Sequence, residues 1–368
     1  SHLIVTAPTT TTLSVTGSST GTGTDSDTTV TGGLNTTVNN SGGDDMLLTG
    51  ASGSVTVTGG SEATDVTSVN SNSKLTEVTI LDGGVVAIGD GLTALADVTF
   101  NDDSVTDTIT TVSISGNAGA STINSDKLTS LTLANSSQDS TITAAASTRT
   151  LTVGVNKLTN GTITDAEATT LVVNATGTKS DNVDLVFAKA TTVTINSDVN
   201  LELDNLTTNV ATTLTVTGAG KTTVSADTVA ALVTVDASGN SGGLTIVDAL
   251  NTGLTYTGST GADTISVAGS TKTTSTGAGN DVVTNTALLG TGGTINGGDG
   301  TDTIGFTANG VLTAANGAKI SNFETLRLTA VTDADMDNIS GITAVQTSGN
   351  VTIADMTAEQ AANVTVLA

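Results

Sequence analysis

The sequence predicts an all-β protein, a parallel β-solenoid of the β-helix or β-roll type with coils of about 20 residues and short corner turns. Two observations predict this fold: triplets of the form apolar-x-apolar recur once per coil period, and a second row of strand-like segments runs between them. The composition agrees, because the 368 residues include one Tyr, four Phe and no Trp, whereas Thr makes up roughly a fifth of the chain. Small β-branched side chains suit a thin, regularly stacked β core better than a globular one.

Side chains alternate between the two faces of a strand, so each triplet places its outer residues in the core and its central residue, usually Thr, toward solvent. The first row comprises Val55-Thr-Val57, Val78-Thr-Ile80, Val98-Thr-Phe100, Val112-Ser-Ile114, Leu131-Thr-Leu133, Leu151-Thr-Val153, Leu171-Val-Val173, Val193-Thr-Ile195, Leu214-Thr-Val216, Val233-Thr-Val235 and Leu254-Thr-Tyr256. The second row comprises Ile123, Ile142, Ile163, Val183-Asp-Leu185, Leu201-Glu-Leu203, Val224 and Leu244-Thr-Ile246. Helical turns are expected only at corners, in 165–169, 226–231 and 332–337, because these segments are too short for independent helices.

Four segments follow from this pattern. Residues 1–70 are expected to form N-terminal solenoid coils with a candidate calcium ladder, 71–257 a regular β-solenoid, 258–310 a calcium-binding β-roll, and 311–368 further coils, beginning with Leu326-Arg-Leu328. No polar cap closes the pattern, so we expect the chain to be part of a longer one.

The charge excludes several classes of partner. A net charge of −25, from 35 acidic and 10 basic residues, repels nucleic acid and anionic membrane surfaces. No apolar run approaches the roughly 20 residues that a membrane-spanning helix needs, so direct membrane insertion is not expected. The chain has no Cys, which removes disulfides and thiol catalysis. Its first residues lack the basic start and cleavage site of a signal peptide, so we expect a fragment or an export route that does not use the N-terminus.

Three glycine-aspartate boxes near the C-terminus indicate calcium turns: Gly258-Ser-Thr-Gly261-Ala-Asp263, Thr276-Gly-Ala-Gly279-Asn280-Asp281 and Gly297-Gly-Asp299-Gly300-Thr-Asp302. In such repeats the glycines permit sharp turns and expose carbonyl groups, and the aspartate supplies a hard oxygen ligand for Ca²⁺. The spacing from Asp263 to Asp281 equals two half-turns of a nonapeptide repeat, and the spacing from Asp281 to Asp302 is slightly longer. We therefore expect the three carboxylates to stack on adjacent coils.

An N-terminal echo repeats the pattern. Asp25, Asp45 and Asp65 are evenly spaced along the chain, and Gly43 keeps the glycine of the box before Asp45. Their spacing equals the coil period, so these residues are candidates for a second calcium ladder; ordinary solvated Gly-Asp turns are the alternative at both ends of the chain.

The boxes resemble the RTX repeats of proteins exported by type I secretion, which bind Ca²⁺ in a parallel β-roll. More closely, residues from about 161 to 328, with the three boxes and Asn322-Phe-Glu-Thr-Leu-Arg327, resemble the lattice region of Caulobacter-type surface-layer (S-layer) proteins. The resemblance implies a secreted, extracellular protein that assembles with itself, through Ca²⁺, into a two-dimensional crystalline coat on a Gram-negative cell surface. It also implies an anchoring domain for lipopolysaccharide and a secretion signal, neither of which is found in this sequence. Two departures stand out, since Ser259 and Thr276 replace glycines of the repeat.

Two other functions remain open. A calcium-stiffened adhesin or biofilm matrix protein would use the same rod, but its sugar-binding sites would need aromatic platforms, and the five aromatic residues are few and scattered. A polysaccharide lyase or hydrolase would need paired carboxylates, and adjacent pairs such as Asp102 and Asp103 point to opposite faces of a strand. The basic residues Arg149 and Arg327 are expected in surface ion pairs. We therefore expect no enzyme activity.

Overall fold

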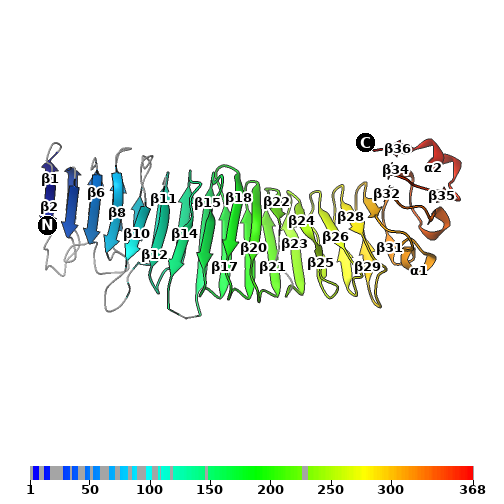
Figure 1. Cartoon of the computed structure of the whole chain (residues 1–368), viewed down its shortest axis with the longest axis horizontal. Helices are drawn as coiled ribbons and strands as arrows, with labels where there is room; N and C mark the ends of the chain where they lie inside the picture. The colour runs from blue at the N-terminus through cyan, green and yellow to red at the C-terminus, as the bar shows by residue number, and fades with distance from the viewer. Residues whose placement is uncertain are drawn as a thin grey trace. The chain divides into compact units, whose positions relative to one another are not determined.

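The chain is a parallel β-solenoid, as the sequence predicts, with almost no helix among the residues that are described. In this computed structural model the described residues are 3–7, 12–16, 28–33, 35–39, 46–49, 53–58, 66–70, 75–81, 85–88, 97–101, 107, 109–116, 119–145, 148–225 and 231–367. The chain divides into two compact units, Ser1–Ala190 and Thr191–Ala368. Within each unit, strands of two sheets alternate along the chain, so that each coil contributes one strand to each sheet (Figure 1).

In the first unit, the neighbouring strands of each sheet are parallel. The first sheet contains β1 (Leu3–Ala7), β3 (Thr28–Gly32), β5 (Met46–Thr49), β7 (Val66–Asn70), β9 (Val85–Ile88), β11 (Thr111–Ser115), β13 (Ser130–Ala134), β15 (Thr150–Asn156) and β17 (Thr170–Ala175). The second sheet contains β2 (Thr12–Thr16), β4 (Asn35–Asn39), β6 (Gly53–Thr58), β8 (Leu75–Leu81), β10 (Asp97–Asn101), β12 (Ala120–Asn124), β14 (Ser140–Thr143), β16 (Thr162–Asp165) and β18 (Ser180–Val186).

The second unit shows the same alternation. Its first sheet contains β19 (Thr192–Ser197), β21 (Thr213–Gly218), β23 (Thr234–Asn240), β25 (Thr255–Thr257), β27 (Thr273–Ser275), β29 (Thr294–Asn296) and β31 (Ile320–Ser321). Its second sheet contains β20 (Leu201–Thr207), β22 (Thr222–Val224), β24 (Leu244–Leu250), β26 (Thr264–Val267), β28 (Val282–Asn285), β30 (Thr303–Phe306), β32 (Thr325–Thr329), β34 (Ala344–Ser348) and β36 (Val364–Val366). A separate pair, β33 (Ala334–Asp335) and β35 (Ile353–Ala354), accompanies the short helices α1 (Ala314–Gly317), η1 (Met336–Asn338) and α2 (Ala358–Ala362).

The two predicted rows correspond to the two sheets from Val112 onward. The prediction that the triplets before Val112 belong to the first row was wrong, since Val55, Val78 and Val98 lie in β6, β8 and β10 of the second sheet. Both sheets share one coil period, so spacing alone does not tell them apart. The available signal was the step from Val98 to Val112, which is clearly shorter than the coil period.

Register stacks like on like in the core. Val112 pairs with Leu131, and Leu131 with Val153 on the next coil, and all three side chains are buried. Val233 is an exception, because β23 begins one residue later and the Val233 side chain is 52% exposed. The prediction that Val233 points inward was therefore wrong.

All five aromatic rings lie in the core. Phe100, Phe187, Tyr256, Phe306 and Phe323 are each at most 1% exposed. None of these rings is therefore available on the surface as a platform for stacking sugars.

The corners use left-handed backbone where coils turn sharply. Gly116 and Gly218 have φ of 76° and 100°, and Asn135 has φ of 51°, conformations that glycine and asparagine tolerate best. The predicted helical turn at 165–169 was wrong, because the Asp165 carboxylate holds a bend there by accepting from the N–H groups of Glu167 and Ala168. Of the segment predicted as a turn in 332–337, Met336 and Asp337 lie in the short helix η1, whereas Ala334 and Asp335 form β33. Residues 226–230 lie outside the described residues.

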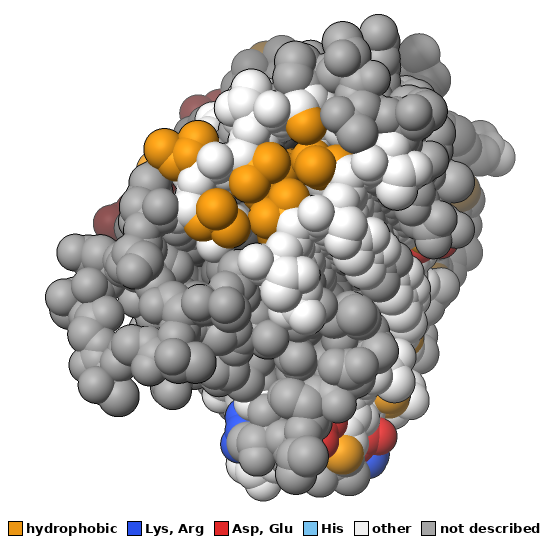
Figure 2. Space-filling model, turned by 90° about the vertical axis from the view of Figure 1, so that its left-hand side faces the viewer, with side chains coloured by type: hydrophobic (Ala, Val, Ile, Leu, Met, Phe, Trp, Pro, Cys, Tyr) orange, Lys and Arg blue, Asp and Glu red, His pale blue; other side chains and the backbone are white. Residues whose placement is uncertain are grey.

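The N-terminal face of the first unit shows hydrophobic side chains gathered at one place (Figure 2). Leu3 and Ile4 of β1 are 37% and 65% exposed. Among the described strands of the unit, β1 pairs with β3 only, and these apolar side chains of β1 are open to solvent.

Candidate functional site

The three glycine-aspartate boxes form three stacked turns in the second unit. They join β25 to β26, β27 to β28 and β29 to β30, so each turn leads from the first sheet to the second. Backbone hydrogen bonds link successive turns, as from Gly279 N to the carbonyl oxygen of Asp299 and from Asp299 N to that of Gly277. We call these turns box 1 (258–263), box 2 (276–281) and box 3 (297–302).

Glycines are required where one turn lies on the next. A Cβ atom at Gly298 would lie 1.8 Å from the carbonyl oxygen of Gly277, and one at Gly300 would lie 1.6 Å from that of Gly279. Both residues also have positive φ, 93° and 148°. Spacing and backbone conformation therefore both exclude larger residues at these positions.

The box aspartates form a carboxylate ladder, as their spacing predicts. Asp263, Asp281 and Asp302 are all fully buried. Asp263 N donates to Asp281 Oδ1 at 2.7 Å, and Asp281 N donates to Asp302 Oδ1 at 2.8 Å. Each of these two carboxylates thus binds the backbone of the preceding coil, which explains why the side chains fold inward instead of facing solvent.

Glu324 extends the ladder by one coil. Its Oε2 accepts from Asp302 N at 2.8 Å, the same contact that the next box aspartate would make. The box motif does not include Glu324, so the sequence pattern did not identify it as a ligand. The available signal was its position about one coil period after Asp302.

Two carboxylate oxygens of the ladder are buried without a hydrogen-bond partner: Asp281 Oδ2 and Asp302 Oδ2. Burial raises the pKa of Asp281 from 3.8 to about 6, and the charges of Asp263 and Asp302 add to the effect, although the N–H of Asp263 and the nearby Thr276 hydroxyl oppose it. Burial likewise raises the pKa of the Asp302 carboxyl, with further contributions from Glu324 and Asp299. A buried anionic oxygen without a partner is energetically costly, so both oxygen atoms are suited to serve as ligands of a cation.

Asp263 differs from the other two, because hydrogen bonds satisfy both of its oxygens. Oδ1 accepts from Leu244 N and Ser259 Oγ, each at 2.7 Å, and Oδ2 accepts from Ser259 N at 2.9 Å and Tyr256 OH at 3.0 Å. Burial raises the pKa of Tyr256 well above 10, with the charge of Asp263 adding to the effect, so the phenol stays a donor. Ser259, which replaces a glycine of the repeat, supplies two of these four bonds.

Asn240 ends the series on the N-terminal side. Its buried amide donates to the carbonyl oxygens of Gly218 and Gly220, each at 3.0 Å, and its Oδ1 accepts from the N–H groups of Gly242 and Gly243. The amide thus satisfies backbone groups of two coils from within the turn.

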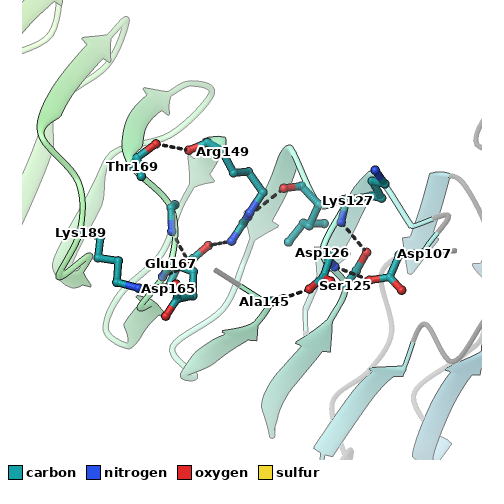
Figure 3. Close-up of polar contacts among 12 residues, drawn as sticks. Asp107, Ser125, Asp126, Lys127, Ala145, Arg149, Asp165, Glu167, Thr169 and Lys189 are labelled. Atoms are coloured by element: carbon teal, nitrogen blue, oxygen red, sulfur yellow. Dashed lines mark hydrogen bonds and ion pairs between the residues drawn. The ribbon is translucent and has the colours of Figure 1, made fainter. Parts of the chain in front are cut away.

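A buried ion pair stabilises the first unit (Figure 3). Arg149 Nη2 lies 2.6 Å from Asp165 Oδ2, and both side chains are at most 5% exposed. Arg149 Nη1 also donates to the carbonyl oxygen of Leu128 at 2.8 Å. The prediction of a surface pair for Arg149 was wrong. Arg327 instead donates to Gln346 Oε1 at 2.9 Å.

Other predicted ligands are not brought to the ladder. Asp25, Gly43, Asp45 and Asp65 lie outside the described residues, so the second ladder stays a prediction. In the described part of the chain, one group of three acidic side chains brings its oxygens within 4.8 Å of one another: Asp335, Asp337 and Asp355. Two of the three are exposed, and Asp335 Oδ1 accepts from Asp337 N as the cap of η1.

No protein-family model matches the chain, and no curated protein matches its sequence. Within the described residues, none of the helices has the length and apolar character needed to span a bilayer.

Proposed function

We propose that this chain is a structural S-layer protein, which assembles with itself through Ca²⁺ into a two-dimensional coat outside a Gram-negative cell. The observation that carries the calcium part is the pair of buried, unpartnered oxygens on Asp281 and Asp302. They lie in turns that contain no Lys or Arg. Bound Ca²⁺ would supply the positive charge that this ladder lacks, with carboxylate and carbonyl oxygens as its preferred ligands.

Assembly follows from the charge of the chain. At a net charge of −25, separate copies repel one another. Where acidic side chains are neutralised, as at millimolar extracellular Ca²⁺, copies approach closely, and a regular solenoid offers the same surface at every coil. The same ladder would be empty at cytoplasmic calcium levels, which suits folding after export.

An adhesin is the alternative, and a specific observation weighs against it. All five aromatic side chains are buried in the core, so a sugar-binding platform would have to be built without them. A lyase or hydrolase is weaker still, because the buried Arg149 is already paired with Asp165. A second copy of this chain is therefore the partner that we propose.

Negative-stain electron microscopy of the purified chain tests this function. We expect ordered sheets in millimolar CaCl₂ and dispersed particles in EGTA, with MgCl₂ as the control for ionic strength and divalent charge. Dispersed particles in all three conditions would contradict a self-assembling lattice. Sheets that persist in EGTA would contradict the role of calcium.

A further inference from the structure

In each of the three boxes, the aspartate and a carbonyl oxygen of the next coil lie close to the first residue of the box. We call these three groupings of oxygens cradles and consider each as a candidate set of cation ligands. At Gly258, a Cβ atom would lie 2.4 Å from Asp263 Oδ2 and 2.0 Å from the carbonyl oxygen of Thr276. At Gly297, it would lie 2.8 Å from Asp302 Oδ2 and 2.0 Å from the carbonyl oxygen of Asn322. Carboxylate and carbonyl oxygens therefore converge on the same small space.

Side chains of the protein already satisfy the first cradle. Asp263 Oδ2 accepts from Tyr256 OH and Ser259 N, and its Oδ1 accepts two further hydrogen bonds. A cation there would have to break the hydrogen bond of a buried phenol. These four hydrogen bonds stabilise the buried Asp263 carboxylate, as a bound metal ion would otherwise do.

The side chain of Thr276 fills the second cradle. Thr276 stands where boxes 1 and 3 have glycine, and its buried hydroxyl donates to the carbonyl oxygen of Gly297 at 2.6 Å. That carbonyl corresponds to the Asn322 carbonyl of the third cradle. A methyl-bearing side chain thus takes the space, and its hydroxyl takes one of the two oxygen ligands.

The third cradle alone of the three has no side-chain hydroxyl at its oxygens. Its first residue is Gly297, and Asp302 Oδ2 is buried with no hydrogen-bond partner. The carbonyl oxygen of Asn322 and the carboxylate of Glu324 come from the next coil, where Glu324 already contacts Asp302 N. Asp281, whose Oδ2 is also unpartnered, donates its backbone N–H to this same Asp302 carboxylate.

We propose that the boxes hold a single divalent cation, at the third cradle, with Asp302, Glu324 and the Asn322 carbonyl as ligands, and that box 1 and box 2 hold none. This inference rests on the calcium dependence proposed above and deepens it. Glu324, which belongs to no glycine-aspartate box, becomes a ligand, and Asp263 becomes a structural residue that hydroxyl and amide donors satisfy.

Isothermal titration calorimetry with CaCl₂ tests the assignment on the full chain after removal of metal with EDTA. We expect Asp302→Asn and Glu324→Gln each to weaken one binding event at least tenfold relative to the parent chain. Asp263→Asn should change affinity and stoichiometry by less than twofold. Asp204→Asn removes the same charge at an exposed position of β20, outside the boxes, and it is the matched control. Far-UV circular dichroism in EGTA confirms that each variant is folded.

Thr276→Gly provides a gain-of-site test that does not depend on a damaging change. By emptying the second cradle beside the unpartnered Asp281 Oδ2, it should add one bound Ca²⁺ per chain. Equal loss of binding in Asp263→Asn and Asp302→Asn would overturn the single-site assignment while leaving calcium binding intact. An unchanged stoichiometry in Thr276→Gly would overturn the role of the Thr276 side chain in keeping a cation out of box 2. Absence of any calcium binding to the parent chain would overturn the proposed function itself.

Discussion

Asp281 should make the metal-free protein less stable as the pH rises, and its replacement by Asn should remove this effect. Its pKa is raised from 3.8 to about 6 in the folded protein, mainly by burial. The folded state therefore keeps a proton that the unfolded state loses, so the free energy of unfolding falls as the pH rises from about 3.8 and levels off above about 6. Asp281→Asn should consequently be more stable than the parent at pH 7.5, although a candidate ladder carboxylate has been lost.

The size of the effect follows from the shift. Moving a pKa from 3.8 to about 6 corresponds to at most ~3 kcal/mol. We expect about 1–2 kcal/mol, because neighbouring residues of the turn, such as Asn280 and Thr301, are exposed and solvent screens the charge. Asp281 lies in the second unit, Thr191–Ala368. For a unit of 150–250 residues, each kcal/mol of unfolding free energy changes Tm by roughly 2–4 °C, so the Asn variant should melt about 2–8 °C above the parent at pH 7.5.

Thermal melts followed by circular dichroism in EGTA, between pH 5 and pH 8, measure this difference. The range stays above the pI of about 4.1, where the loss of net charge favours precipitation. Roughly half of the gap between parent and Asp281→Asn should open between pH 5 and pH 7.5. Asp299→Asn removes the same charge at an exposed site and should show little gap. If Asp281→Asn and the parent have parallel melting curves across this range, the buried, unpartnered carboxylate is not a source of instability.

Three further perturbations test separate parts of the structure by denaturant unfolding. Arg149→Leu leaves the buried Asp165 carboxylate without its ion-pair partner and should lower the free energy of unfolding by about 3 kcal/mol. This is the lower end of the range for a broken buried pair, because two backbone N–H groups still bind Asp165. The double variant with Asp165→Asn should recover part of the loss, and no recovery would argue against an unpaired buried charge as the cause. Tyr256→Phe removes a 3.0 Å hydrogen bond to Asp263 and should cost about 1.5–3 kcal/mol, a cost that a solvent-exposed phenol would not produce. Gly300→Ala would place a Cβ atom 1.6 Å from the carbonyl oxygen of Gly279 and should prevent box 3 from stacking on box 2. We expect loss of calcium binding with an otherwise intact circular dichroism spectrum. A variant that binds calcium normally would show that the two turns are farther apart.

Much of the fold could be predicted because apolar and polar residues alternate in short segments that recur once or twice per coil. Apolar-x-apolar triplets place strands of about the right length at about the right positions, and from Val112 onward they follow the sheets correctly. The errors came from information that alternation does not contain. Val98 and Val112 lie in consecutive strands, β10 and β11, and therefore belong to different sheets. Val233 precedes β23 and its side chain is exposed, although the triplet pattern places it in the core.

The ladder was predictable, but the state of its oxygens was not. Spacing places Asp263, Asp281 and Asp302 on adjacent coils, and the structure confirms that stacking. Whether a stacked carboxylate needs a cation depends on donors that reach it from elsewhere in the coil. Tyr256 lies close to Asp263 in the sequence and donates to it. The triplet pattern places the aromatic ring in the core, but it does not predict which acceptor the phenol hydroxyl reaches.

Successive coils of the second unit differ in how the buried polar side chains of their turns are hydrogen-bonded. The turns that hold Asn240, Asp263, Asp281 and Asp302 each bury a polar side chain, and an unpartnered buried polar group is costly. Asn240 provides its own donors and acceptor, and Tyr256 with Ser259 satisfies Asp263. Farther along the chain, carboxylate oxygens of the ladder remain without a partner, at Asp281 and Asp302. If the boxes hold a single cation, as proposed above, the dependence on a cation is confined to one place in the second unit. Calcium would then act on that part of the second unit while the other coils keep their structure, as a switch for assembly requires.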